Sequence, residues 1–288
     1  MYLIPKYSNL PERFLPDNVL LLLNKYLQMV EKNGNGQLRL SKIQKVKANI
    51  YRTLKNPKVT GNINSRLTNI NKRMRIFSKH YQLITSSRLI VGLGSASVLE
   101  TSIKLHHIYG VPYIPSSAVK GVLRAYKMWE LSDWNVDLLK AFELAISLVY
   151  EKCKSPEKEF SEKLLKITII EKREEIIKKQ NELFNFLSIF GSQSQKGSLI
   201  VFDAFPENFD GFDIDIMNPH YPNYYQGTEP PADWQNPKPI QFLAVPAGTK
   251  FNFYFINPYE KLETDLKNAL SILGIGAKTS LEYGVFNT

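Results

Sequence analysis

Apolar residues near the start of the chain recur at the spacing of amphipathic helices. Two stretches, residues 18–30 and 39–55, follow this pattern. In the second stretch the apolar side consists of Leu40, Ile43, Val46, Ile50 and Leu54. Lys45 and Arg52 project to the opposite side, so this helix is predicted to have one core face and one cationic face.

The helical period then breaks and gives way to that of strands. Residues 56–75 are interrupted by Pro57 and several asparagines, which predicts a basic connecting region. Strands are expected over residues 80–91 and 97–108, joined by the turn Gly92-Leu93-Gly94-Ser95.

A helix is predicted to begin near Ser116 or Ser117, after a stiff and extended lead over residues 109–115. One face of that helix carries Val119, Val122, Leu123 and Tyr126. Residues 136–151 and 161–190 also have helical periodicity, and we interpret them as an inserted helical bundle.

Strand periodicity returns after the bundle. The expected strands are residues 198–205, 212–216, 240–245 and 250–256. Residues 217–239 carry six prolines and four Tyr or Trp residues. This stretch is too rich in proline for a central strand, so a long ordered loop is expected.

The last predicted helix opens at Asn257-Pro258-Tyr259-Glu260. These residues supply an N-cap, a proline at the first helical position and a capping-box glutamate. The helix is expected to stop at Gly274 after burying Leu262, Leu266, Ala269 and Leu273. A final strand is predicted over residues 281–286.

Without the insertions, the order of elements is strand, helix, strands, helix, strand. This order fits a split β-α-β unit, so the predicted fold class is α+β with a ferredoxin-like (RRM-like) core. The chain is predicted to form a single domain over residues 1–288. Residues 1–78 would be a helical N-terminal extension, residues 79–130 and 187–288 the core, and residues 131–186 a helical insertion.

The positive charge of the chain is concentrated in one segment. The formal net charge is +10 at pH 7, yet the segment from Lys32 to Leu99 contains fourteen Lys and Arg residues and no Asp or Glu, which leaves −4 for the rest. Clustered cations favour a polyanion such as nucleic acid through the release of counterions. A solvated basic face and a basic helix on a membrane surface are the alternatives.

Several classes of protein find no support in the sequence. No apolar run approaches the roughly 18 to 20 residues that span a bilayer, and the residues after Met1 do not resemble a signal peptide. Cys153 is the single cysteine, so we expect no intrachain disulfide and no cysteine-based zinc site. Neither HExxH nor GxSxG occurs, nor any carboxylate cluster at metal-binding spacing. We therefore expect a cytoplasmic protein without a metal or cofactor.

The start of the helix after Pro115 carries two locally unfavourable residues. Helix N-termini prefer acidic side chains, yet Lys120 stands where a capping box has Glu. Gly121 costs roughly 1 kcal/mol relative to alanine inside a helix. An anion docked at this N-terminus would explain both, with Ser116 and Ser117 as donors and Arg124 one turn further on. The alternative is a glycine required for helix packing beside a solvated lysine.

A second candidate site is the run Gly274-Ile275-Gly276-Ala277-Lys278-Thr279-Ser280. It follows a predicted helix and opens a predicted strand, a context that excludes both a dinucleotide-binding fingerprint and a P-loop. Small residues, one cation and two hydroxyls suit a sugar-phosphate backbone. The alternative, a helix C-cap followed by a turn, accounts for Gly274 alone.

The histidines are the third candidate site. His106 and His107 are adjacent on a predicted strand, so their side chains are expected to point to opposite faces and not to bind one metal ion together. His80 and His220 lack recognisable ligand spacing. A single histidine can act as a general base in RNA cleavage, so His106 and His107 remain candidates for catalysis. A structural role or contact with a partner is the alternative.

The blocks around these sites resemble the RAMP superfamily. Its signature, roughly P-Y-I-P-G-S-S-x-K-G-x-x-R, is similar to the run from Pro112 to Arg124, although Ser116 and Ala118 stand where the family commonly has glycine and serine. The middle block and the C-terminal glycine-rich loop of the family resemble Phe190-Gly191-Ser192 with Lys196-Gly197-Ser198, and the Gly274 to Ser280 run. Met217-Asn218-Pro219-His220-Tyr221 narrows the resemblance to the sixth subunits of type III-B CRISPR (Cmr) complexes.

This resemblance, which covers residues 80–130 and 187–288, implies a ferredoxin-like core in an RNA-targeting ribonucleoprotein of antiviral defence. It implies contacts with the 3′ region of guide RNA or with the duplex of guide and target RNA, beside other Cmr subunits and without a membrane. It also implies that the chain lacks the aspartate with which the backbone-forming subunits cut target RNA. The alternatives are a metal-independent endoribonuclease of the same superfamily that processes guide RNA, and a structural subunit that binds an acidic protein.

We hypothesise that Lys120, Arg124 and Lys278 contribute to one phosphate-binding surface. The two motifs would meet because the first and last strands of a ferredoxin-like core lie in the same sheet. The residues expected to bind RNA are Gly94, Ser116, Ser117, Lys120, Arg124, Gly274, Gly276, Ala277, Lys278, Thr279, Ser280, Lys45 and Arg52. No residue is expected to be catalytic.

Overall fold

The computed structural model describes residues 57–287 except 96, 98, 99, 226, 235, 236 and 238, together with residues 23, 30–32 and 38–40. Strands β1 (Val30–Lys32) and β2 (Leu38–Leu40) pair as an antiparallel hairpin. The two helices expected over residues 18–30 and 39–55 are therefore wrong where they overlap these strands. The Asn33-Gly34-Asn35-Gly36 run between the strands is a strong hairpin signal that outweighs helical periodicity. Leu23 is helical, and most of both predicted helices, with Lys45 and Arg52, lies outside the described residues.

The expected connecting region over residues 56–75 is instead a long helix, α3 (Pro57–Phe77). Ile63, Leu67 and Ile70 recur at helical spacing and are buried. The asparagines that suggested a loop hold the helix to the rest of the protein. Asn71, which is only 2% exposed, donates from Nδ2 to the Pro206 carbonyl over 3.0 Å and accepts from the Tyr254 hydroxyl over 2.6 Å.

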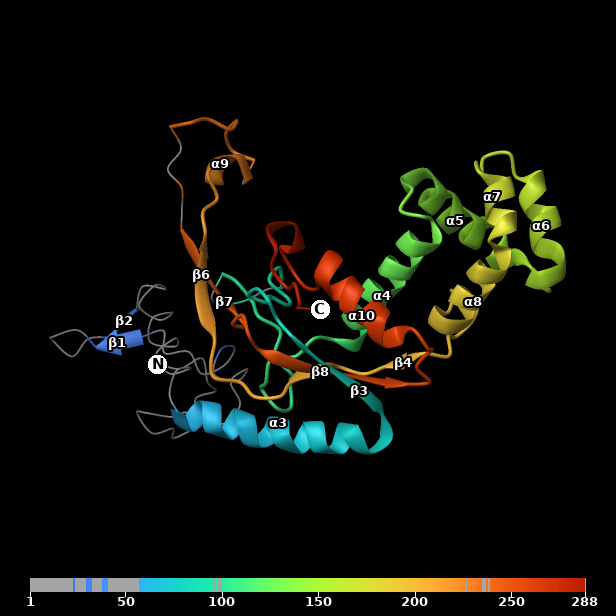
Figure 1. Cartoon of the computed structure of the whole chain (residues 1–288). Helices are drawn as coiled ribbons and strands as arrows, with labels where there is room; N and C mark the ends of the chain where they lie inside the picture. The colour runs from blue at the N-terminus through green and yellow to red at the C-terminus, as the bar shows by residue number, and fades with distance from the viewer. Residues whose placement is uncertain are drawn as a thin grey trace.

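Strand β8 (Lys250–Ile256) is the centre of an antiparallel sheet with the order β3-β8-β4. Its neighbours are β3 (Lys79–Ile84) and β4 (Ile200–Val201), and β5 (Phe205–Pro206) also pairs with it. Both faces of β8 are buried, since Phe251, Phe253 and Phe255 alternate with Asn252 and Tyr254. The Asn252 and Tyr254 face is covered by α3, and helices α4 and α10 lie on the opposite side of the sheet (Figure 1).

Helices α4 (Ser116–Leu131) and α10 (Leu262–Ile272) pack against each other. The predicted start of α4 after Pro115 is confirmed, and Val119, Leu123 and Tyr126 are buried as expected. The predicted start of α10 at Asn257 is wrong, because the helix begins at Leu262. Asn257 has a φ of +55°, a left-handed conformation that an N-cap residue does not adopt, and its side chain donates to the Ser198 carbonyl instead.

The predicted helical bundle consists of five short elements grouped on one side of the molecule (Figure 1). They are α5 (Val136–Leu148), the 3-10 helix η1 (Tyr150–Lys152), α6 (Pro156–Lys166), α7 (Arg173–Lys178) and α8 (Gln180–Phe190). The single helix expected over residues 161–190 is thus divided into three. The break follows a β-branched run from Ile167 to Ile170, which is a poor helix former, and Lys172 then adopts a φ of +56°.

Strands β6 (Asp213–Met217) and β7 (Ile240–Ala244) form a separate antiparallel ribbon that projects from the body of the molecule (Figure 1). We refer to residues 213–244 as the arm. Both strands agree with the predicted ones. The segment expected to be a loop contains one short helix, α9 (Pro222–Tyr225).

Two predicted strands are absent from the part of the chain that the structure describes. Residues 97–108 make only an isolated bridge, between Leu105 and Pro112. Residues 281–286 follow the 3-10 helix η2 (Thr279–Leu281) and make only the bridge from Phe286 to Thr85. Glu282 has a φ of +64°, so the backbone turns there and cannot extend as a strand. The predicted α+β class is nonetheless confirmed. None of the described helices is both long and apolar enough to cross a membrane.

Candidate nucleic-acid interface

The C-terminal glycine-rich loop, residues 274–284, folds back against the chain that extends from β3. Gly276 has a φ of +103°, and a Cβ atom there would lie 2.3 Å from the Ile90 carbonyl oxygen. The Ala277 amide donates to that same carbonyl over 2.8 Å, and the Gly284 amide donates to the Arg88 carbonyl over 2.8 Å. These glycines are therefore required by close approach of the protein's own backbone, an explanation that the sequence did not suggest.

Polar and cationic groups lie on the outer side of this loop. Lys278 has a φ of +61° and is half-buried, with its Nζ atom 5.3 Å from the centre of the Phe242 ring. Within the described part of the chain, Lys278 has no ion-pair partner. Thr279 is half-buried and Ser280 is exposed. The loop thus presents two hydroxyl residues and one cation, Lys278, whose charge no described acidic side chain neutralises.

The turn at residues 92–95, which contains Gly94, lies beside the glycine-rich loop. Leu93 and Ala277 pack against one small core cluster. The Lys104 amide donates to the Val91 carbonyl over 2.7 Å at the start of this turn, and Lys104 itself is exposed. Lys104 is a second cation of this surface that we did not predict. Its position between the buried residues Ile103 and Leu105 was the signal that could have identified it.

Four side chains fix the glycine-rich loop and the chain beside it to the base of the arm. Arg88 donates from Nε to Asp213 over 3.1 Å and from Nη1 to Asp215 over 3.0 Å. The Tyr283 hydroxyl donates to Asp215 over 2.6 Å. This hydrogen bond, assisted by Arg88, lowers the pKa of Asp215. The loop and the arm therefore share one anchor.

At the start of α4 the chain supplies its own anion. The Ser116 amide donates to Asp203 Oδ1 over 2.7 Å, and the Lys120 ammonium donates to the Leu199 carbonyl over 3.0 Å. Burial and the nearby Lys196 ammonium lower the pKa of Lys120. An internal carboxylate thus takes up the amide that we had assigned to an external anion. Ser117 is exposed.

Further along α4, Arg124 is engaged by the helical bundle. Its guanidinium donates to both carboxylate oxygens of Glu143, over 2.9 and 3.3 Å, and lies 5.4 Å from the Phe186 ring centre. Gly121 is exposed, and apart from the adjacent backbone of its own helix no described atom lies within 4 Å of the place that a Cβ would occupy. Packing of this helix against the described residues, the alternative explanation for Gly121, is therefore wrong.

The single surface expected from Lys120 and Lys278 does not form. Lys120 binds Leu199, which precedes Ile200, and Ile200 pairs with Ile256 at the C-terminal end of β8. The glycine-rich loop binds Ile90, which lies beyond the N-terminal end of β8, since the preceding Leu89 bridges to Val245. The seven residues of β8 span roughly 20 Å. The structure unites Gly94 with residues 274–280, and separates them from Ser116, Lys120 and Arg124.

The two adjacent histidines stack on each other, so the prediction that they point to opposite faces is wrong. The rings of His106 and His107 are 5.0 Å apart and nearly parallel, because the chain turns here and is not a strand. His106 also stacks on Tyr109, and its Nδ1 accepts from the amides of Ile108 and Tyr109. Burial, assisted by His107, lowers the pKa of His106. Its surroundings are those of a packed structural residue.

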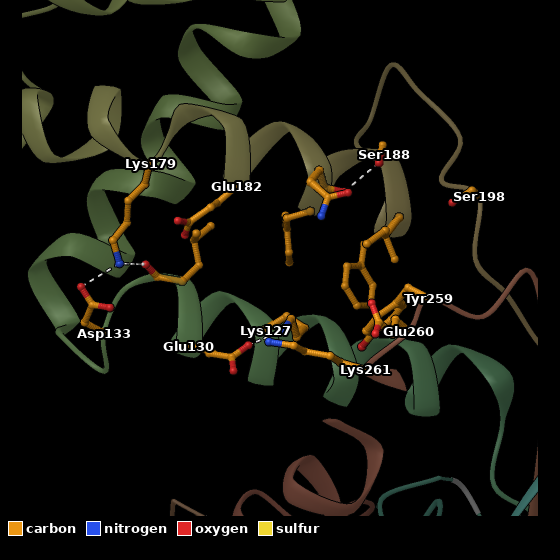
Figure 2. Close-up of a pocket in the computed structure, with 15 residues that line it drawn as sticks. Lys127, Glu130, Asp133, Lys179, Glu182, Ser188, Ser198, Tyr259, Glu260 and Lys261 are labelled. Atoms are coloured by element: carbon orange, nitrogen blue, oxygen red, sulfur yellow. Dashed lines mark hydrogen bonds and ion pairs between the residues drawn. The ribbon is translucent and has the colours of Figure 1, made fainter. Parts of the chain in front are cut away.

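A pocket of about 770 Å³ lies between α4, α8 and residues 259–261 (Figure 2). Two of its three lysines are bound by neighbouring acids, since Lys179 contacts Asp133 over 2.7 Å and Lys127 pairs with Glu130. Burial and the Asp265 carboxylate raise the pKa of the Tyr259 hydroxyl on one wall. The three lysines of this pocket lie among four acidic residues, unlike Lys278, which has no ion-pair partner among the described residues. Among the residues that the structure describes, no three His, Cys, Asp or Glu side chains are grouped so that they could hold a metal ion.

Known proteins share both the sequence and the fold. The chain is 41% identical over 231 residues to the CRISPR system Cmr subunit Cmr6 of Pyrococcus furiosus, which covers 69% of this chain and 65% of that protein. It is 21% identical over 229 residues to the corresponding Cmr6 of Saccharolobus solfataricus, covering 76% of this chain and 61% of that protein. The chain thus spans less than two thirds of the length of either relative.

A solved structure and a family model agree with these relatives. A chain of the type III-B Cmr-beta complex bound to cognate target RNA, determined by cryo-EM, superposes with a TM-score of 0.52 at 19% identity. The match covers 85% of this chain and 70% of that one, and it shows a shared fold. The model of the RAMP superfamily matches residues 82–287, which is well over half of the sequence. The chain is therefore a member of the RAMP superfamily.

Proposed function

We propose that this chain is a non-catalytic, RNA-binding subunit of a cytoplasmic type III-B CRISPR effector ribonucleoprotein. It would contact the 3′ region of the guide RNA or the duplex of guide and target RNA, with other Cmr subunits as neighbours. The identity to Cmr6 of Pyrococcus furiosus supports the assignment to this complex. The observation that carries the RNA-binding role is the surface around the glycine-rich loop, where Lys278 and Lys104 have no ion-pair partner among the described side chains.

The chemistry of this surface suits a sugar-phosphate backbone. Lys278 and Lys104 offer point charges to phosphate oxygens, and the Thr279 and Ser280 hydroxyls can donate hydrogen bonds. Such contacts position a strand without selecting its sequence. This agrees with a subunit that holds RNA whose sequence varies from one guide to the next.

The arrangement of the sheet and of two helices supports a ferredoxin-like core. Strands β3, β8 and β4 are antiparallel, and α4 and α10 pack together on one face of them. In this core, α4 follows β3 along the chain and α10 follows β8, as the split β-α-β order requires.

The test is the salt dependence of RNA affinity in a Lys104→Gln, Lys278→Gln double variant. Loss of two phosphate contacts is expected to weaken binding of a single-stranded RNA about tenfold near 100 mM salt and to reduce the salt slope by about 1.4. Lys158→Gln with Lys166→Gln is the matched control, since both lysines are exposed on α6 and unpaired within the described region. Equal affinity and slope in the two variants would contradict this assignment.

A further inference from the structure

Helix α3 ends at Phe77 and so lies entirely before the region that the RAMP model matches, which begins at residue 82. It contains no acidic residue, and it is the longest described helix. Its inner side, with Ile63, Leu67, Ile70 and Asn71, covers the sheet. Its outer side consists of the exposed residues Ser65, Thr68, Asn69, Lys72, Arg73 and Ile76. The fold therefore uses one side of α3 and leaves the other to solvent.

The cations of α3 differ in what they do for the fold. Arg75 faces the sheet and contacts Glu207 over 2.5 Å and Asn252 over 3.3 Å, so its charge is neutralised internally. Lys72 and Arg73 are exposed and contact no acidic side chain in the described part of the chain. Two unneutralised cations on a helix without acids create a local positive potential, which attracts an anion.

We propose that the outer side of α3 is a second nucleic-acid surface, which binds the phosphodiester backbone of an RNA strand. The charges of Lys72 and Arg73 would displace counterions from two phosphates. The exposed Asn69 amide, one turn before them, can donate to a further phosphate oxygen, whereas the Thr68 hydroxyl already donates to the Asn64 carbonyl. A helix of 21 residues is about 31 Å long, enough to follow several nucleotides.

This surface is separate from the one around Lys278. The Tyr254 hydroxyl donates to Asn71, so α3 lies on the Asn252 and Tyr254 face of β8 (Figure 1). The glycine-rich loop instead lies beyond the N-terminal end of that strand. The inference rests on the proposed RNA-binding function, but the two surfaces can be tested independently because they share no residue.

The test compares Lys72→Glu with Arg73→Glu against a control of equal charge change, Lys158→Glu with Lys166→Glu on α6. The probe is a fluorescein-labelled single-stranded RNA of about 20 nucleotides. This is longer than the roughly 4 to 16 nucleotides that one single-strand-binding fold covers. We expect the α3 variant to bind at least about tenfold more weakly than the control near 100 mM salt, with a salt slope smaller by about 1.4. The milder Lys72→Gln, Arg73→Gln variant, checked by thermal unfolding, gives the same comparison if charge reversal impairs folding.

The possible outcomes separate the two proposals. If the α3 variants bind RNA like their controls while the Lys104 and Lys278 variant is weakened, the α3 surface does not exist and the proposed function stands. If all variants bind like the controls, both fail. If the α3 variants keep their RNA affinity but no longer associate with purified Cmr subunits, the partner of α3 is an acidic protein and the inference is overturned.

Discussion

Gly121 lowers the stability of its helix although a larger residue would fit at that position. It lies inside α4, it is exposed, and nothing in the described protein would touch a Cβ there. Gly121→Ala is therefore expected to raise the free energy of unfolding by about 0.5–1 kcal/mol, measured by urea denaturation. Ala125→Gly, one turn further on the same exposed side, is the control and should lower it by a similar amount. A destabilised Gly121→Ala variant would show that the glycine serves the fold after all.

Asp215 links the stability of the arm to pH. The Tyr283 hydrogen bond, with help from Arg88, places the pKa of Asp215 below its unfolded value of about 3.9. The stabilisation is therefore complete above the unfolded pKa and is lost as the pH falls through the folded one. Asp215→Asn should lower the free energy of unfolding at pH 7 by about 1 kcal/mol and make it less sensitive to acid below about pH 4. Urea unfolding at pH 7 and pH 3 measures both effects.

The control for Asp215 is another aspartate with no such contacts. Asp210 is exposed and has no partner among the described residues, so Asp210→Asn should leave stability unchanged at both values of pH. If the two variants behave alike, the hydrogen bonds from Arg88 and Tyr283 do not stabilise the fold.

At the scale of elements, local signals predicted structure where tertiary contacts did not override them. The α4 start follows from Pro115 and the spacing of Val119 and Leu123, and both features are local. The α3 prediction failed because asparagine is a poor helix former on its own. Asn64 and Asn71 bind distant parts of the chain, at Phe209 and Pro206, and no local pattern reveals those partners.

The candidate site was likewise predictable from local signals, whereas the distant partners of its residues were not. The glycine-rich loop and Gly94 were found from composition, and they do lie side by side. Lys120 and Arg124 were assigned to RNA because their partners, Leu199 and Glu143, are far along the chain or in another helix. The sequence does not show whether the fold already neutralises a cation. Lys104 was missed because it lies in no motif, although no described acidic side chain neutralises it.

On the scale of the whole molecule, the sheet sets the distance between cationic surfaces. Strand β8 carries α3 on one face and α4 with α10 on the other, and the glycine-rich loop lies beyond its N-terminal end. The acids of the helical bundle, such as Glu143, neutralise the cations that face them. Among the described residues, unneutralised cations lie around Lys278 and on α3, and an RNA strand bound at either place would release counterions.

An RNA strand held on this molecule is expected to remain intact. Incubation with CRISPR repeat RNA in EDTA between about pH 6 and pH 9 should yield no defined fragments on a denaturing gel, because His106 is packed among aromatic rings and its Nδ1 already accepts two backbone amides. A His106→Ala, His107→Ala variant that gives the same background as the unaltered protein is the control. Defined cleavage that this variant abolishes would make the stacked histidines a catalytic pair and the chain an endoribonuclease.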